Sequence, residues 1–172
     1  LRCEVQDPDA ARADALAAAS ASPMLSGGNL IPVGGGKDSV VTLELLSDRR
    51  AANVPFLINP TPAGMDTAAV AGYPSERSIA VKRTIHPRLL ELNRQGFLNG
   101  HTPFSAVIAF SSYMTAFRFG FDRIVLSNER SASEGNLVFD GREVNHQHSK
   151  SLAFEGLLAG VLAAATGGAL QY

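Results

Sequence analysis

Three glycines followed by a cation, an acid and a hydroxyl form the part of the sequence best suited to chemistry, Gly34-Gly35-Gly36-Lys37-Asp38-Ser39. Glycine permits positive φ angles and leaves no Cβ between the backbone and a ligand. An apolar run at 30–33 precedes the glycines, and apolar residues at helical spacing follow them. The pattern therefore predicts a strand, a tight turn and a helix. Free backbone N–H groups at such a turn, together with the positive end of the helix, favour a bound phosphate.

This glycine-rich loop fits neither of two common nucleotide-binding motifs. The P-loop needs Ser or Thr directly after Lys37, where Asp38 stands, and the dinucleotide fingerprint needs a glycine in place of Ser39. The loop instead resembles Ser-Gly-Gly-x-Asp-Ser of the PP-loop ATP pyrophosphatases, with Gly34 replacing the first serine. The resemblance implies cleavage of ATP between its α and β phosphates and adenylation of a substrate oxygen. The alternative is an ordinary glycine-rich turn, which does not explain why Lys-Asp-Ser opens the helix.

The rest of the chain alternates between predicted strands and helices. Strands are predicted at 30–33, 54–58, 78–81 and 123–127, helices at 39–49, 65–71, 87–94, 103–119 and 152–165, and a hairpin at 137–144. This alternation predicts a doubly wound, mostly parallel α/β sheet with helices on both faces. Pro32 lacks the N–H that a central strand needs, so the first strand should be short or irregular. The last helix is apolar enough to be buried.

Length and composition restrict the other possibilities. An alanine-rich helix is predicted at 9–21, so residues 1–27 read as an N-terminal helix and linker, and 28–172 as one domain. The net charge of -1 argues against nucleic-acid binding. Cys3 is the single cysteine, which excludes an internal disulfide and a thiol metal cluster and fits a reducing, cytoplasmic setting. Neither a signal peptide nor a membrane span is recognisable.

Polar clusters follow three of the predicted strands. The glycine-rich loop follows the first strand, Asn59 follows the second, and 127–131 follows the fourth. Ligands of open parallel sheets bind beyond the carboxyl ends of the strands. We therefore expect these clusters to converge at one edge of the sheet.

Two further polar runs sharpen the resemblance. Residues 127–136 read Ser-Asn-Glu-Arg-Ser-Ala-Ser-Glu-Gly-Asn, and 144–151 read Val-Asn-His-Gln-His-Ser-Lys-Ser. With the glycine-rich loop, and in the same order, these runs resemble the MurL family of UDP-N-acetyl-α-D-muramoyl-L-alanyl-L-glutamate epimerases. The resemblance covers about 28–158. It implies a UDP-linked muramoyl dipeptide as substrate, ATP and a divalent cation, and release of AMP and pyrophosphate as the terminal glutamate is inverted. It also implies a longer protein, with an additional N-terminal region.

The implied reaction is chemically reasonable. The α-proton of a carboxylate is hard to remove, because the enolate would carry a second negative charge beside the first. An acyl-adenylate removes that charge and makes the α-proton more acidic. Reprotonation from the other face then inverts the centre. Such an enzyme needs a phosphate loop, a metal, proton-transfer groups and a clamp for the anionic ends of the substrate.

Candidate ligand-binding residues follow from these needs and from the resemblance. The ATP-binding candidates are Gly34, Gly35, Gly36, Lys37, Asp38, Ser39, Asn59 and His101. Asp38 and Glu129 are the candidate metal ligands, since hard oxygen ligands suit Mg²⁺; capping of the helix is the alternative role for Asp38. The substrate-binding candidates are Asn128, Arg130, Ser131, Asn145 and Ser149. Arg130 or Lys150 could grip a carboxylate or diphosphate.

For proton transfer we favour His146 and His148, with Glu129 and Lys150 as rivals. On an extended loop, two residues that are two positions apart point to the same side. The same spacing suits a metal pair, although the absence of nearby cysteines disfavours zinc. A surface or capping role is the alternative for either histidine.

Two other functions remain open from the sequence. One is a different PP-loop enzyme, either an amide-forming ligase or a tRNA-modifying enzyme. The other is a non-catalytic nucleotide-binding module, which would not need so many convergent polar groups. Release of AMP and pyrophosphate only with a glutamate-ended substrate would separate the three.

Overall fold

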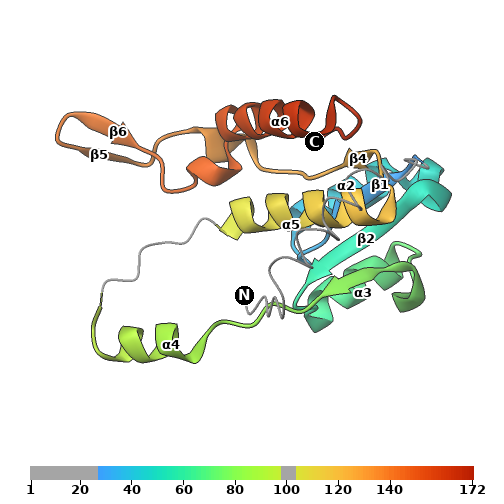
Figure 1. The fold of residues 1–172 in the computed structure, drawn as a ribbon, viewed down its shortest axis with the longest axis horizontal. Helices are drawn as coiled ribbons and strands as arrows, with labels where there is room; N and C mark the ends of the chain where they lie inside the picture. The colour runs from blue at the N-terminus through green and yellow to red at the C-terminus, as the bar shows by residue number, and fades with distance from the viewer. Residues whose placement is uncertain (1–26, 98–103) are drawn as a thin grey trace, which may run out of the picture.

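Four short parallel strands form the main sheet of the computed structural model, which describes residues 27–97 and 104–172 (Figure 1). They are β1 (Asn29–Pro32), β2 (Asn53–Ile58), β3 (Ile79–Val81) and β4 (Arg123–Ile124). Their spatial order is β3-β2-β1-β4. The chain therefore moves outward from β1 to β3 and then returns to the other side of β1. This reversal creates a switch point between β1 and β4, where open parallel sheets bind their ligands.

Helices cover both faces of this sheet, so the predicted doubly wound α/β fold is confirmed. Of these helices, α2 (Lys37–Leu45) and α3 (Pro62–Val70) pack on one face and α5 (Phe104–Phe119) packs on the other. α4 (Pro87–Arg94) lies apart from the sheet, and α6 (Leu152–Thr166) packs on α5 (Figure 1). The 3₁₀ turns are η1 (Ser47–Ala52), η2 (Ser75–Arg77), η3 (Arg130–Ser133) and η4 (His148–Lys150). Successive residues of β1 point to opposite faces. Ile31 packs in a buried cluster with Leu43 of α2 and Ala68 of α3, whereas Leu30 packs in a second cluster with Ala116 of α5.

The last helix forms a further layer outside α5 (Figure 1). Leu158 and Leu162 of α6 pack against Ala109 of α5. Other apolar side chains of α6 face outward, among them Leu152, which is 72% exposed, and Leu157, which is 68% exposed. The prediction of a buried helix is therefore wrong. The segment is apolar on all sides, but in the described residues it has only one neighbouring helix to pack against.

The predicted hairpin at 137–144 is confirmed and projects away from the sheet (Figure 1). Its strands are β5 (Leu137–Phe139) and β6 (Arg142–Val144). Asp140 and Gly141 between them have φ angles of 50° and 70°. Positive φ at both central residues is what a tight two-residue hairpin turn requires.

The fourth strand is shorter than predicted, and Pro32 explains why. The Leu30 carbonyl accepts from Val125 N–H at 3.0 Å, whereas Val33 N–H donates to β2, at Phe56 O, 2.8 Å away. Backbone groups alternate along a strand, so Pro32 faces the β4 side and has no N–H to donate there. The ladder stops, and the residues after Val125 leave the sheet. β1 is itself a short strand, as expected.

Most of the other predicted elements lie within a few residues of their observed bounds. Residues 87–94 form α4 as predicted. The helix predicted at 39–49 is divided, because α2 ends at Leu45 and η1 follows it. The helix predicted at 9–21, and with it the proposed N-terminal linker, lies outside the described residues. Among the helices at 27–97 and 104–172, none is both long and apolar enough to cross a membrane.

Candidate functional site

The glycine-rich loop is fixed on one side and open on the other. Gly35 has a φ of +85°, and a Cβ there would lie 2.7 Å from Gly64 N, in the first turn of α3. At Gly34 and Gly36 an added Cβ would meet no atom of residues 27–97 and 104–172 within 4 Å. Gly36 is the N-cap of α2, and no side chain in the described part of the chain caps that helix end. Two glycines thus leave room for a ligand beside the first turn of α2, while the third fits the loop against α3.

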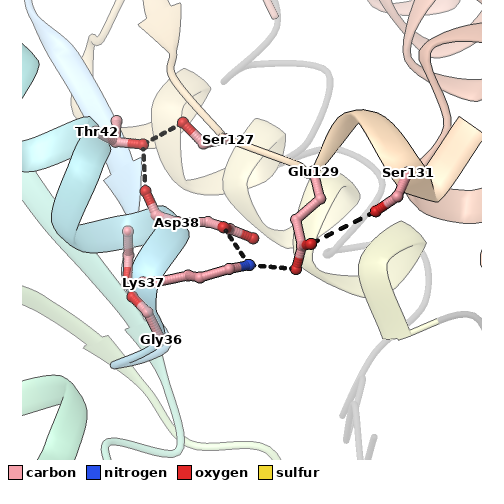
Figure 2. Close-up of polar contacts among 8 residues, drawn as sticks. Gly36, Lys37, Asp38, Thr42, Ser127, Glu129 and Ser131 are labelled. Carbon is pink, nitrogen blue, oxygen red and sulfur yellow. Dashed lines mark hydrogen bonds and ion pairs between the residues drawn. The ribbon is translucent and has the colours of Figure 1, made fainter.

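Lys37 joins this loop to the chain that follows β4. Its ammonium donates to the Glu129 carboxylate, and to Asp38 Oδ1 at 3.3 Å (Figure 2). Ser131 Oγ donates to the other Glu129 oxygen at 3.5 Å. The Lys37 and Glu129 side chains are 68% and 54% exposed, so a ligand can reach both. The Asp38 side chain makes an ion pair with Lys37, and the N-cap position of α2 is taken by Gly36. Asp38 therefore does not cap α2.

The Lys37–Glu129 contact favours the charged form of both groups. The hydrogen bond from Lys37, followed by its charge, lowers the pKa of Glu129. The hydrogen bond to Glu129 is the largest cause that raises the pKa of Lys37. The pair should therefore persist from below the ordinary pKa of glutamate to above that of lysine.

A second contact connects the same two segments closer to the core. Thr42 of α2 and Ser127, in the segment after β4, are hydrogen-bonded through their hydroxyls (Figure 2). Thr42 Oγ1 also donates to Asp38 O at 3.0 Å. Ser127 can reach Thr42 because the chain has left the β4 ladder two residues earlier. The predicted convergence of the glycine-rich loop and 127–131 is thus confirmed.

Residues of the two polar runs line two adjoining pockets. Asn128, Glu129, Arg130 and Lys150 line the first pocket, next to Ser127. Asn145, Glu143 and His148 contribute to the second, and both pockets share Ser133 and Leu152. The structure therefore brings Lys150 of the second run to the residues that follow β4.

The other three predicted substrate-binding residues, Asn145, Ser131 and Ser149, lie near these pockets but make different contacts. Asn145 Nδ2 donates to Ala132 O at 2.7 Å, and Asn145 Oδ1 accepts from Gln147 N at 2.8 Å, so this side chain ties the two runs together. Ser131 contacts Glu129, as described above. Ser149 lies in η4 and is not among the residues lining these two pockets.

The two histidines differ in their placement. His146 is exposed, and its backbone N–H donates to Asn136 Oδ1 at 3.1 Å. The His148 ring packs edge-on against Phe154, with centroids 6.1 Å apart. Residues 146 and 147 form a turn and η4 begins at His148. The assumption of an extended loop that places both rings on one side is therefore wrong.

An apolar pocket, not anticipated from the sequence, adjoins the open side of the glycine-rich loop. It is lined by Val33 and Gly34 after β1, by Ile58 at the end of β2, by Phe104 and Ile108 of α5, and by other apolar side chains. The sequence points to this region only through His101, which precedes the long apolar helix and is predicted to bind the nucleotide. His101 lies outside the described residues.

Asn59 is tied to the backbone after β3. Its Nδ2 donates to Arg83 O at 3.0 Å, and its Oδ1 accepts from Arg83 N at 2.6 Å. Both polar atoms of the side chain are thus engaged with protein.

Two carboxylates are available for a metal ion. Asp38 and Glu129 both contact the Lys37 ammonium, so they are close enough for one cation to touch both. No group of three or more metal-binding side chains occurs in the described part of the chain. This donor set fits Mg²⁺, which is commonly held by one or two carboxylates together with substrate phosphates.

Comparison with known proteins indicates the same family as the two polar runs. A family model described as the MurL N-terminal domain matches residues 1–172. A UDP-N-acetyl-alpha-D-muramoyl-L-alanyl-L-glutamate epimerase of Salinispora tropica is 43% identical over 133 residues, covering 77% of this chain and 28% of that protein. An epimerase of the same name from Xanthomonas oryzae pv. oryzae is 39% identical over 155 residues, covering 90% of this chain and 33% of that protein. No solved structure matches.

The chain thus spans about a third of the length of these curated relatives. The matched description is that of an N-terminal domain. The match over the whole chain and the identities of the relatives agree, and we conclude that this chain belongs to the MurL family.

Proposed function

We propose that this chain supplies the nucleotide site of an ATP-dependent epimerase that inverts the terminal L-glutamate of UDP-MurNAc-L-Ala-L-Glu. The observation that carries the proposal is the meeting of Lys37, beside the glycine-rich loop, with Glu129, in the pocket that also contains Arg130 and Lys150. A phosphate-binding loop and a set of groups suited to an anionic substrate therefore share one edge of the sheet. The names of the relatives supply the substrate.

ATP would place its phosphates on the open side of the glycine-rich loop. The first-turn N–H groups of α2 and the Ser39 hydroxyl, which now donates to Gly36 O at 2.8 Å, are the available donors. The base would occupy the apolar pocket that adjoins Gly34, since purines favour apolar surroundings with few polar contacts. Lys37 would turn from Glu129 to the phosphates and offset the charge of the leaving pyrophosphate.

Asp38 and Glu129 would hold the divalent cation once Lys37 has turned away. The ion would offset phosphate charge during adenylation. Glu129 then has two alternating partners, the Lys37 ammonium and the metal ion.

The substrate would enter the pocket lined by Asn128, Arg130 and Lys150. Arg130 suits the planar, bidentate recognition of a carboxylate or phosphate. A carboxylate oxygen of the terminal glutamate attacks the α-phosphorus, the α–β bond breaks, and pyrophosphate leaves. A base then takes the α-proton, a proton returns on the other face, and water cleaves the mixed anhydride to release AMP.

We assign proton transfer to Lys150, with Glu129 as the second candidate. Both line the pocket beside the phosphate loop, and a base must reach the proton before its pKa matters. His148 lines only the adjoining pocket, and His146 lines neither. We therefore place these two groups ahead of the histidines that the sequence favoured.

Isotope incorporation tests this proposal. The chain is incubated with ATP, Mg²⁺ and UDP-MurNAc-L-Ala-L-Glu in heavy water, and the glutamate is analysed for chirality and deuterium. Deuterated D-glutamate with equimolar AMP is the expected result. The Xanthomonas oryzae relative, treated in the same way, shows whether the assay itself works.

Other outcomes separate the alternatives. AMP without deuterium would indicate another adenylating enzyme, such as a ligase, and nucleotide binding without AMP would indicate a non-catalytic module. The Lys150→Ala variant should keep ATP binding and lose deuterium incorporation, with Lys82→Ala as a matched control at an exposed position outside the pocket. Unchanged turnover in Lys150→Ala would rule out the assignment of Lys150.

A further inference from the structure

We infer that Arg83 contacts the base of the bound nucleotide and that Asn59 is a positioning residue that holds Arg83 in place. This inference rests on the proposed nucleotide site and assigns two residues to its rim. It starts from the observation that Asn59, expected to contact the nucleotide, has both of its side-chain polar atoms engaged with Arg83.

Asn59 continues the pairing of two neighbouring strands beyond their ends. Its backbone N–H donates to Val81 O at 2.8 Å, the last residue of β3. Its φ of 49° then turns the backbone away from the sheet. The side-chain amide takes over, since it accepts from the N–H and donates to the carbonyl of Arg83. The Arg83 backbone is thereby tied to the end of β2 although β3 has ended.

The side chain of Arg83 reaches the apolar pocket through Phe104. The guanidinium carbon lies 5.3 Å from the centroid of the Phe104 ring. Phe104 is the first residue of α5 and lines the pocket together with Gly34 of the phosphate loop. The guanidinium therefore stands at the rim of the pocket in which we place the base.

The chemistry of the rim favours a base over a phosphate as the partner of Arg83. A planar guanidinium can stack on aromatic faces, and that of Arg83 already lies over the Phe104 ring in a cation–π contact. The surroundings are apolar side chains, whereas the phosphate-binding N–H groups lie at the start of α2. A base entering the pocket could stack on the guanidinium or make an edge-to-face contact with Phe104.

Binding of two probes tests the inference. ATP carries a base, and inorganic tripolyphosphate carries only the phosphates, so a contact with the base affects the first probe alone. We expect Arg83→Ala to bind ATP about tenfold more weakly, in the range of a desolvated cation–π contact, and to bind tripolyphosphate as the parent does. Arg83→Lys should lose most of the same affinity, because an ammonium cannot stack as a guanidinium does. Lys82→Ala, the neighbouring cation, is the matched control and should bind both probes normally.

The positioning role of Asn59 is tested by combining its substitution with that of Arg83. Asn59→Gly keeps the positive φ accessible but removes the amide, and should weaken ATP binding while leaving tripolyphosphate binding unchanged. The double variant should be no weaker than Arg83→Ala alone, because the two changes act through one contact. A merely structural role would instead lower the affinity for both probes, and the losses would add. Thermal unfolding of each variant shows that it is folded.

The outcomes distinguish this inference from the proposed function. Equal ATP affinity of the parent and Arg83→Ala would overturn the inference and leave the nucleotide site intact. A parallel loss of tripolyphosphate affinity, restored by Arg83→Lys, would overturn the base contact and make Arg83 a phosphate ligand. Failure of the parent to bind either probe would overturn the proposed nucleotide site, and the inference with it.

Discussion

Gly35 is held by two constraints that act on different atoms. Its backbone has a φ of +85°, which L-residues with a Cβ seldom adopt. A Cβ would also lie 2.7 Å from Gly64 N and 2.8 Å from Ala63 C, both backbone atoms of α3. Neither neighbour can move without shifting the helix. Gly34 carries neither constraint, although it is the adjacent residue of the same loop.

Gly35→Ala should therefore destabilise the protein, whereas Gly34→Ala should not. The left-handed conformation alone costs about 1–2 kcal/mol with a Cβ present, and the contact with Gly64 adds to it. Gly34→Ala should change the free energy of unfolding by less than about 0.5 kcal/mol. Urea unfolding of both variants measures the difference, and equal stabilities would contradict this account of the loop.

A buried amide network joins the starts of β1 and β2 to the segments around them. Asn53, the first residue of β2, is fully buried. Its Oδ1 accepts from Asn29 Nδ2 at 2.7 Å, and its Nδ2 donates to Leu46 O at 2.8 Å and to Tyr73 Oη at 3.0 Å. One side chain thus satisfies groups from β1, from the end of α2 and from the turn after α3. This network sets how α2 and α3 lie on the sheet that carries the site.

Asn53→Ala should cost several kcal/mol of stability. The change leaves buried polar groups without partners, each worth about 1–3 kcal/mol, although water entering the gap would reduce the sum. Asn93→Ala, on the exposed surface of α4, is the matched control and should stay within about 0.5 kcal/mol of the parent. A small effect of Asn53→Ala in chemical unfolding would show that the network adds little.

At the scale of the whole molecule, residues 170–172 return to the sheet and pair with the edge strand β4. Gln171 N–H donates to Asp122 O, and Gln171 O accepts from Ile124 N–H, both at 2.9 Å. Leu170 is buried in the cluster under α5, and Tyr172 packs against that cluster and the one between α5 and α6. Burial, followed by the charge of Glu155, raises the pKa of Tyr172 from 10.0 to about 12.

The Tyr172 shift predicts a loss of stability in alkali. A tyrosine whose pKa is higher in the folded protein binds more protons there than in the unfolded chain between about pH 10 and about pH 12, so stability falls as the pH rises through that window. The loss should be about 1–2 kcal/mol after allowance for solvent screening. Urea unfolding at about pH 9 and about pH 11.5 should show a smaller loss for Tyr172→Phe than for the parent. Identical losses would mean that other groups cause the decline.

The sequence predicted the layers of the fold better than the fine positions of the site. Alternating patterns located the strands and helices, and the parallel sheet then required the loops after β1 and β4 to converge. The burial of α6 was misjudged because hydropathy does not reveal how many neighbours a segment has. β4 is short because Pro32 faces the β4 side of β1. Which neighbouring strand a residue faces is decided only when the sheet is assembled, so the sequence does not reveal it.

Two of the contacts described above could not be predicted, because they join residues that lie far apart in the sequence. Arg83 and Phe104 meet only because β3 and α5 are brought to the same edge of the sheet. Lys150 joins Glu129 only because Asn145 and Ser133 tie the two polar runs together. No spacing within either run indicates these contacts.

Lys37 acts as an internal counterion in the structure, because it sits between Asp38 and Glu129. In the proposed function, binding of magnesium between these two carboxylates would exchange one cation for another. The measured dissociation constant of the metal complex should equal the intrinsic constant divided by the fraction of molecules in which the lysine has swung away. A protein of this kind would discriminate against free magnesium, since only an incoming triphosphate gives the displaced ammonium a new partner.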